Sequence, residues 1–128
     1  MGDKPYLELK DLNVYKSSCG LCIIAWKIYN NLDWNTKKII GIQFIRAVDS
    51  IGANIAEGYG RYHYLDKIRF YYNSRGSLFE ARHWINIIIE RKLIYDSKLI
   101  QEFNKLLDEI NLLLNGLIKS TLNQKNKE

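Results

Sequence analysis

Residues 43–61 read QFIRAVDSIGANIAEGYGR, and the spacing within them is that of an amphipathic helix. One helical face is polar and carries Gln43, Arg46, Ser50, Asn54 and Glu57. The adjacent face is apolar and carries Phe44, Val48, Ile51 and Ile55. Gly58 and Gly60 are expected to end the helix by adopting the left-handed conformation, which costs glycine no Cβ penalty. Because isolated buried polar groups are costly, the polar face is expected to meet a partner, either this protein or a ligand.

The composition is that of one helical domain. The chain has 128 residues, and its single proline is Pro5, so residues 6–128 are free of helix-breaking proline. The net charge of +5 mildly favours an anionic partner. The sequence has no run of 18 apolar residues and no charged-then-apolar start, so neither a membrane span nor a signal peptide is expected. With two cysteines and no secretion signal, the protein is expected to be cytoplasmic.

Apolar periodicity predicts four helices, over about 12–32, 37–57, 64–92 and 96–123, with a break at 33–36. Asp11 and Asp96 are the expected N-caps of the first and the fourth predicted helix. In the third predicted helix, the residues expected to face the core are Ile68, Tyr71, Tyr72, Leu78, Phe79, Ile85 and Ile89. Long helices joined by short loops pack as an all-α, up-down-up-down antiparallel four-helix bundle. The expected organisation is a flexible lead-in at 1–11, the bundle at 12–122 and a frayed polar tail at 123–128.

The second and third predicted helices share one polar pattern. A basic residue, two small polar residues and an acidic residue follow at i, i+4, i+8 and i+11. The pattern occurs in Arg46, Ser50, Asn54 and Glu57 and again in Arg69, Asn73, Ser77 and Glu80. If the two helices are antiparallel, Arg46 pairs with Glu80 and Glu57 pairs with Arg69, on either side of a Ser/Asn ladder. Such a structural polar network fixes register and performs no chemistry.

Two motifs carry a resemblance to a known family: SIGANIAEGYGR at 50–61 and GSLFE at 76–80. They resemble the bacterial four-helix-bundle family whose genes were first noticed in intervening sequences of large-subunit ribosomal RNA. The accessory variability determinant proteins of diversity-generating retroelements look like a branch of it. The resemblance covers residues 12–117 and implies a ring-shaped homopentamer. The retroelement branch implies binding of RNA or DNA and of a reverse transcriptase through a basic surface. This chain has Ile45 where members frequently carry a second basic residue.

Residues 59–75 interleave basic and aromatic side chains, and residues 61–92 hold seven basic residues against three acidic ones. Arginines bind phosphates and exposed tyrosines stack on unpaired bases. The nucleic-acid-binding residues predicted on this basis are Arg61, Lys67, Arg75, Arg82, Arg91, Lys92 and Tyr62. Binding requires the cations to converge on one solvent face. The alternative is a pure protein-interaction scaffold, in which they are scattered or locked in ion pairs.

No residue set points to an enzyme, a metal or a cofactor. Cys19 and Cys22 form a C-x-x-C inside a predicted helix, where two core-facing cysteines are expected rather than a redox or metal motif. The histidines, His63 and His83, are twenty residues apart. Glycines at 20, 41, 52 and 76 are expected to permit close helix contacts. The apolar runs at 21–26 and 85–89 and the three tryptophans predict a homo-oligomer.

Overall fold

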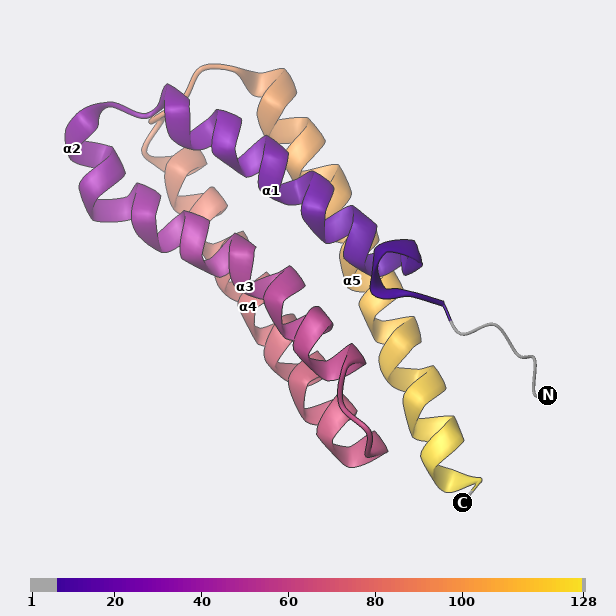
Figure 1. Cartoon of the computed structure of the whole chain (residues 1–128). Coiled ribbons are helices and arrows are strands. Elements are labelled where there is room, and N and C mark those ends of the chain that lie inside the picture. The colour runs from indigo at the N-terminus through magenta and orange to yellow at the C-terminus, as the bar shows by residue number, and fades with distance from the viewer. Residues whose placement is uncertain (1–6, 128) are drawn as a thin grey trace.

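Four long helices lie side by side in the computed structural model, which describes residues 7–127 (Figure 1). The elements in chain order are η1 (Leu9–Asp11), α1 (Asn13–Asn31), α2 (Trp34–Thr36), η2 (Lys37–Gly41), α3 (Ile42–Tyr59), α4 (Tyr64–Glu90) and α5 (Ser97–Asn126). The elements α2, η2 and α3 form one continuous helix, of which η2 is a π-helical segment. α1 packs against α3 and α5, and α4 packs against the same two helices. The predicted all-helical four-helix bundle is confirmed, and the described residues contain no strand.

Two predicted helix starts differ from the structure, and the predicted start of the last helix agrees with it. The Asp96 carboxylate accepts a hydrogen bond from the Leu99 amide at 3.1 Å, which confirms this N-cap. The second helix begins at Trp34, because the Asp33 carboxylate caps it by accepting from the Thr36 amide at 2.8 Å. The predicted break at 33–36 is therefore wrong. Asp11 ends the short helix η1 and caps nothing, since α1 starts after Leu12 without a side-chain cap.

Helix ends differ as well. α4 ends at Glu90, two residues before the predicted end. α5 continues through Asn126, so 123–126, predicted as a frayed tail, are helical. Of the predicted lead-in, residues 1–6 lie outside the described part of the chain, as does residue 128 of the predicted tail; residues 9–11 form η1.

The core contains apolar side chains from all four long helices. Leu21, Ile51, Leu78 and Ile110 are buried at its centre, and the Phe44 and Phe103 rings pack with centroids 5.3 Å apart. Each such side chain contributes roughly 1.5–3 kcal/mol on burial. Trp34–Tyr59 is long and apolar enough to span a membrane by length and composition, alone among the helices of the described residues. Its apolar face is the one that lines this core, which explains its composition.

Several of the described glycines permit close packing between helices, and none adopts the left-handed conformation. No glycine among the described residues has a positive φ, and Gly60 has φ −78°, so the predicted left-handed ending at Gly58 and Gly60 is wrong. A Cβ at Gly58 would lie 2.8 Å from the Tyr71 ring, and one at Gly52 would lie 2.7 Å from Ser18 Oγ. Gly41 is similarly crowded, whereas a Cβ at Gly20 meets an ordinary contact and one at Gly76 meets open space.

Gly52→Ala and Gly116→Ala are expected to change stability in opposite directions. The new methyl group at position 52 would overlap the buried Ser18 side chain, which costs about 1–3 kcal/mol. A Cβ at Gly116 has nothing within 4 Å, so the helix preference for alanine should stabilise by about 0.5–1 kcal/mol. Urea unfolding of both variants measures this, and equal effects would contradict the close α1–α3 contact.

Candidate functional site

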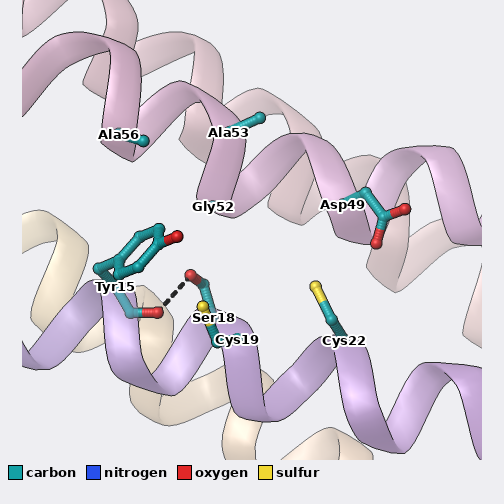
Figure 2. A pocket seen from close by; sticks show the side chains of 8 residues that line it. All are labelled: Tyr15, Ser18, Cys19, Cys22, Asp49, Gly52, Ala53 and Ala56. Carbon is teal, nitrogen blue, oxygen red and sulfur yellow. Dashed lines mark hydrogen bonds between the residues drawn. The ribbon is translucent and has the colours of Figure 1, made fainter. Parts of the chain in front are cut away.

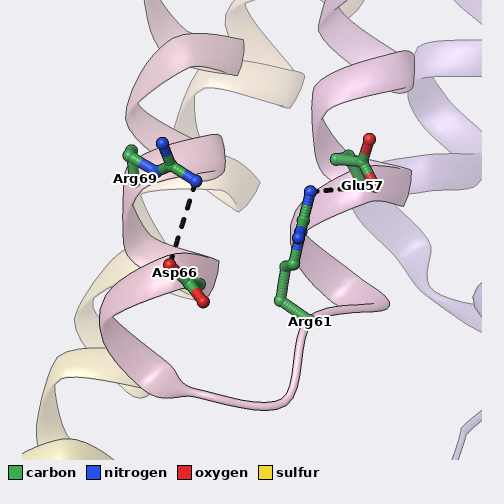
Figure 3. A network of polar contacts seen from close by, with 4 residues as sticks. All are labelled: Glu57, Arg61, Asp66 and Arg69. Carbon is green, nitrogen blue, oxygen red and sulfur yellow. Dashed lines mark ion pairs between the residues drawn. The ribbon is translucent and has the colours of Figure 1, made fainter.

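The two polar stripes do not form the predicted ion pairs. Glu57 pairs with Arg61 at 3.7 Å, and Arg69 pairs with Asp66 at 3.8 Å, each within its own stretch of chain (Figure 3). Within residues 7–127 no ion pair joins Arg46 to Glu80 or Glu57 to Arg69, so that prediction is wrong. The remaining polar groups also bond locally. Asn54 donates to the Ser50 carbonyl at 2.9 Å, Glu80 accepts from the Trp84 indole at 3.2 Å, and Asn73 is exposed.

Small buried residues occupy the seam between α3 and α4 instead. Ser74 Oγ donates to the Ile51 carbonyl at 2.7 Å, and Tyr71 packs against Gly58. The two helices are antiparallel as predicted. Their register is also close to the predicted one, because the predicted stripe pairing places Ser74 opposite Gly52, and the Ser74 hydroxyl bonds to Ile51, one residue away. Arg46, Glu57, Arg69 and Glu80 are exposed, whereas Ser50, Asn54 and Ser77 are partly buried. The stripes thus lie beside the seam, with their charged ends in water.

The predicted nucleic-acid-binding cations fall into three separate groups. Arg61 and Lys67 lie at the α3–α4 turn, where Lys67 Nζ donates to the Tyr59 carbonyl at 2.8 Å. Burial lowers the pKa of Lys67. Arg91 and Lys92 are exposed at the opposite end of α4, which is about 40 Å long. Lys92 has a φ of 54° and takes the left-handed conformation there.

The middle group is tied to α5. Arg75 donates to Asn115 Oδ1 at 3.0 Å and lies over the Tyr72 ring at 5.0 Å from its centroid. Arg82 forms an ion pair with Asp108. The six cations therefore do not converge on one solvent face. This arrangement is the one that the scaffold alternative predicts.

The α3–α4 turn nevertheless presents an aromatic and basic end. Tyr62 is 89% exposed, and its ring meets the His63 ring edge-on with centroids 5.0 Å apart. A cavity of about 230 Å³ opens beside the turn and is lined by His63, Tyr64, Leu65 and Lys125. Lys125 was not predicted, because only the return of α5 along the whole bundle brings it there. The sequence signal that could have placed Lys125 there is the helical periodicity, which continues to the end of α5.

A groove runs between α1 and α3, and we call it the α1–α3 groove (Figure 2). One hollow, of about 220 Å³, is lined by Tyr15, Ser18, Cys19, Cys22, Asp49, Gly52, Ala53 and Ala56. A second, of about 410 Å³, shares Cys22 and Asp49 and adds Ile23, Trp26 and Lys27. The groove exists because most side chains along this part of the seam are small.

The Cys22 thiol in the α1–α3 groove is a poor nucleophile and metal ligand as it stands. Burial, together with the nearby Asp49 carboxylate, raises the pKa of Cys22 to about 12, which opposes the thiolate form. Cys19 is exposed and Cys22 is half-buried, so the prediction of two core-facing cysteines is wrong for Cys19. Among residues 7–127 no three His, Cys, Asp or Glu side chains gather as a metal site.

Large apolar side chains are exposed on all four long helices, including α1 and α4. Three of the predicted inner residues of α4, Tyr72, Phe79 and Ile89, are exposed, and the fractions for Tyr72 and Phe79 are 44% and 59%. On α1, Ile23 and Trp26 are 61% and 54% exposed. The spacing of these residues follows the helical period, and in a sequence that spacing predicts burial. Their exposure is the surface feature that most needs a partner.

Comparison with known proteins identifies relatives but no activity. A family model described as 23S rRNA-intervening sequence protein matches residues 10–116. A crystal structure of a protein with unknown function from the S23 ribosomal protein family, from Bacteroides thetaiotaomicron VPI-5482, is similar with a TM-score of 0.74 and 27% identity. The match covers 83% of this chain and 98% of that one. No curated protein matches.

Stability is expected to fall at high pH through Tyr71. Burial, and to a lesser degree Tyr59, raises the pKa of the Tyr71 phenol from 10.0 to about 12. A raised pKa gives stability that is present below pH 10 and is lost as the pH rises toward 12, up to about 2 kcal/mol. Urea unfolding should therefore show a steeper loss across this range for the wild type than for Tyr71→Phe. Tyr95→Phe, at a 91% exposed side chain, is the control. Parallel curves for the wild type and Tyr71→Phe would refute the effect.

Proposed function

The chain belongs to the 23S rRNA-intervening sequence protein family, and we propose that it is a non-catalytic subunit that assembles with copies of itself into a homo-oligomeric ring. The observation that supports this is the exposure of Ile23 and Trp26 on α1 and of Tyr72 and Phe79 on α4. Contiguous exposed apolar side chains on a small protein mark interaction surfaces. A homopentamer is the assembly that the family resemblance implies.

The positions of the two apolar surfaces favour a ring over a two-fold dimer. α1 and α4 are diagonal members of the bundle, since each packs against α3 and α5. Because the two patches lie on diagonal helices, a single two-fold contact covers only one of them on each copy and leaves the other in water. A head-to-tail contact buries both patches on every copy and closes into a ring when the rotation permits.

Ile23→Asp is expected to dissociate the assembly without unfolding the subunit. A carboxylate at this exposed position would be desolvated in the interface but costs the isolated bundle little. Leu112→Asp, at an exposed apolar residue of α5, is the matched control and should stay assembled. Light scattering at micromolar concentration should give five times 15.1 kDa for the wild type and the control, and the subunit mass for Ile23→Asp. A monomeric wild type would sink the proposal.

Nucleic-acid binding is the second candidate, and the α3–α4 turn favours it. Tyr62 is the exposed aromatic there, Arg61 is beside it, and Lys125 and Lys127 arrive from the end of α5. An assembly would present this end once in every subunit. The modest positive charge of one copy would therefore be multiplied by the number of subunits. RNA and DNA both present the phosphates and bases that such a surface contacts.

A reverse transcriptase as protein partner stays a prediction from the resemblance to the retroelement branch. Cys19 and Cys22 are free thiols, which suits the reducing cytoplasm. The alternative of a scaffold that never contacts nucleic acid is an outcome of the next experiment.

Arg61→Ala/Tyr62→Ala/Lys125→Ala is expected to weaken binding of labelled oligouridine about tenfold or more, because two phosphate contacts and one stacked base are lost. The matched control is Arg91→Ala/Lys92→Ala/Tyr95→Ala, which removes the same residue classes from the other end and should bind nearly as the wild type does. Fluorescence anisotropy over a salt series measures both. Equal losses in the two triple variants would remove the turn as the site, and no binding at low salt would support the scaffold.

A further inference from the structure

We infer that the α1–α3 groove of one copy receives the outer face of α4 from the next copy. The outer face of α4 is defined here by Leu65, Tyr72, Gly76 and Phe79. This inference rests on the proposed self-assembly and names the two surfaces that meet. It also names the charged groups that would orient them.

The groove has the shape and chemistry of a helix-binding surface. Its walls are small residues, so a second helix can approach closely, and Ile23 and Trp26 supply apolar area at its wider part. Asp49 lies in both hollows and is exposed there. It forms no ion pair with any described residue. An unpaired anionic group in the groove favours a partner with a cation beside its apolar residues.

The outer face of α4 has the complementary features. Leu65, Tyr72 and Phe79 are spaced by seven residues, which places them along one side of the helix, and all three are exposed. Gly76 lies between Tyr72 and Phe79, and a Cβ there would have nothing within 4 Å. Within one copy this glycine is not needed for packing. Against a neighbouring copy, it lets another helix approach the α4 backbone.

Charge places an arginine opposite Asp49. Arg69 and Arg75 flank Tyr72 on α4. The Arg69 guanidinium makes an exposed 3.8 Å contact with Asp66 and lies 4.9 Å from the centroid of the Phe70 ring. Such surface pairs contribute little, so Arg69 can exchange its partner at low cost. Lys27 also lines the wider part of the groove, so the complementarity centres on Asp49.

The two surfaces are similar in length. The α1 wall of the groove runs from Tyr15 to Lys27, and the outer face of α4 runs from Leu65 to Phe79. The two stretches are about 18 Å and about 21 Å long. Because the groove and the α4 face are different surfaces of the same chain, each copy can bind one neighbour with each. This contact is head-to-tail, which agrees with a ring.

Disulfide trapping tests the contact with a thiol that the groove already has. Cys19 is exposed there, and Gly76 lies at the centre of the α4 face. In a Cys22→Ser background, Gly76→Cys is expected to form disulfides between Cys19 of one copy and position 76 of the next. Mild oxidation should then give covalent species up to the closed ring on non-reducing gels. Gly116→Cys is the matched control, because a Cβ at Gly116 also meets open space.

The outcomes separate this inference from the proposed self-assembly. Cross-linking of Gly76→Cys at least tenfold faster than of Gly116→Cys supports the contact. An assembled protein with no cross-link at position 76, or with equal rates for both variants, overturns the contact and leaves self-assembly standing. Cys19-to-Cys19 dimers in the Cys22→Ser background alone overturn it in favour of a two-fold dimer. A monomer in light scattering overturns both.

Discussion

Helices α3 and α4 approach so closely that the seam between them admits small side chains and excludes long polar ones. Gly58 leaves room for the Tyr71 ring, and the Ser74 hydroxyl reaches the Ile51 carbonyl at 2.7 Å. Longer side chains such as Arg46 and Glu80 are left in water, where their charges are solvated at no cost. Since α3 and α4 also support α1 and α5, this contact determines which surfaces the bundle can present.

The surfaces that result suit association better than catalysis. The Ser18 and Ser74 hydroxyls are buried and donate to backbone carbonyls, so neither is poised as a nucleophile. Apolar side chains on α1 and α4 face outward, and the cations of α4 are spread along its length. On the proposed self-assembly, copies of this bundle would bury the apolar surfaces against one another and gather one small basic end from each subunit.

Sequence reasoning recovers the helices, their antiparallel order and the Asp96 cap, because periodicity and capping are local properties. It fails on the polar stripes, since spacing shows that Arg46 and Glu57 share a face but not whether that face lies in a seam or beside it. Tyr72 and Phe79 are misread for a related reason: an exposed apolar residue can have the same helical period as a core residue. Lys125 reaches the α3–α4 turn only through the tertiary fold. Gly58 is misread because its role depends on Tyr71, thirteen residues away.

Hydroxyl-radical footprinting of the assembled protein tests most directly whether the exposed apolar surfaces are covered by other copies. Trp26, Tyr72 and Phe79 are about half exposed in the single chain, whereas Tyr62 and Tyr95 are almost fully exposed. The result we expect is strong protection of the first three, with heavy oxidation of the other two. Oxidation of all five in proportion to their single-chain exposure would contradict it, because the two apolar surfaces would then be open to solvent.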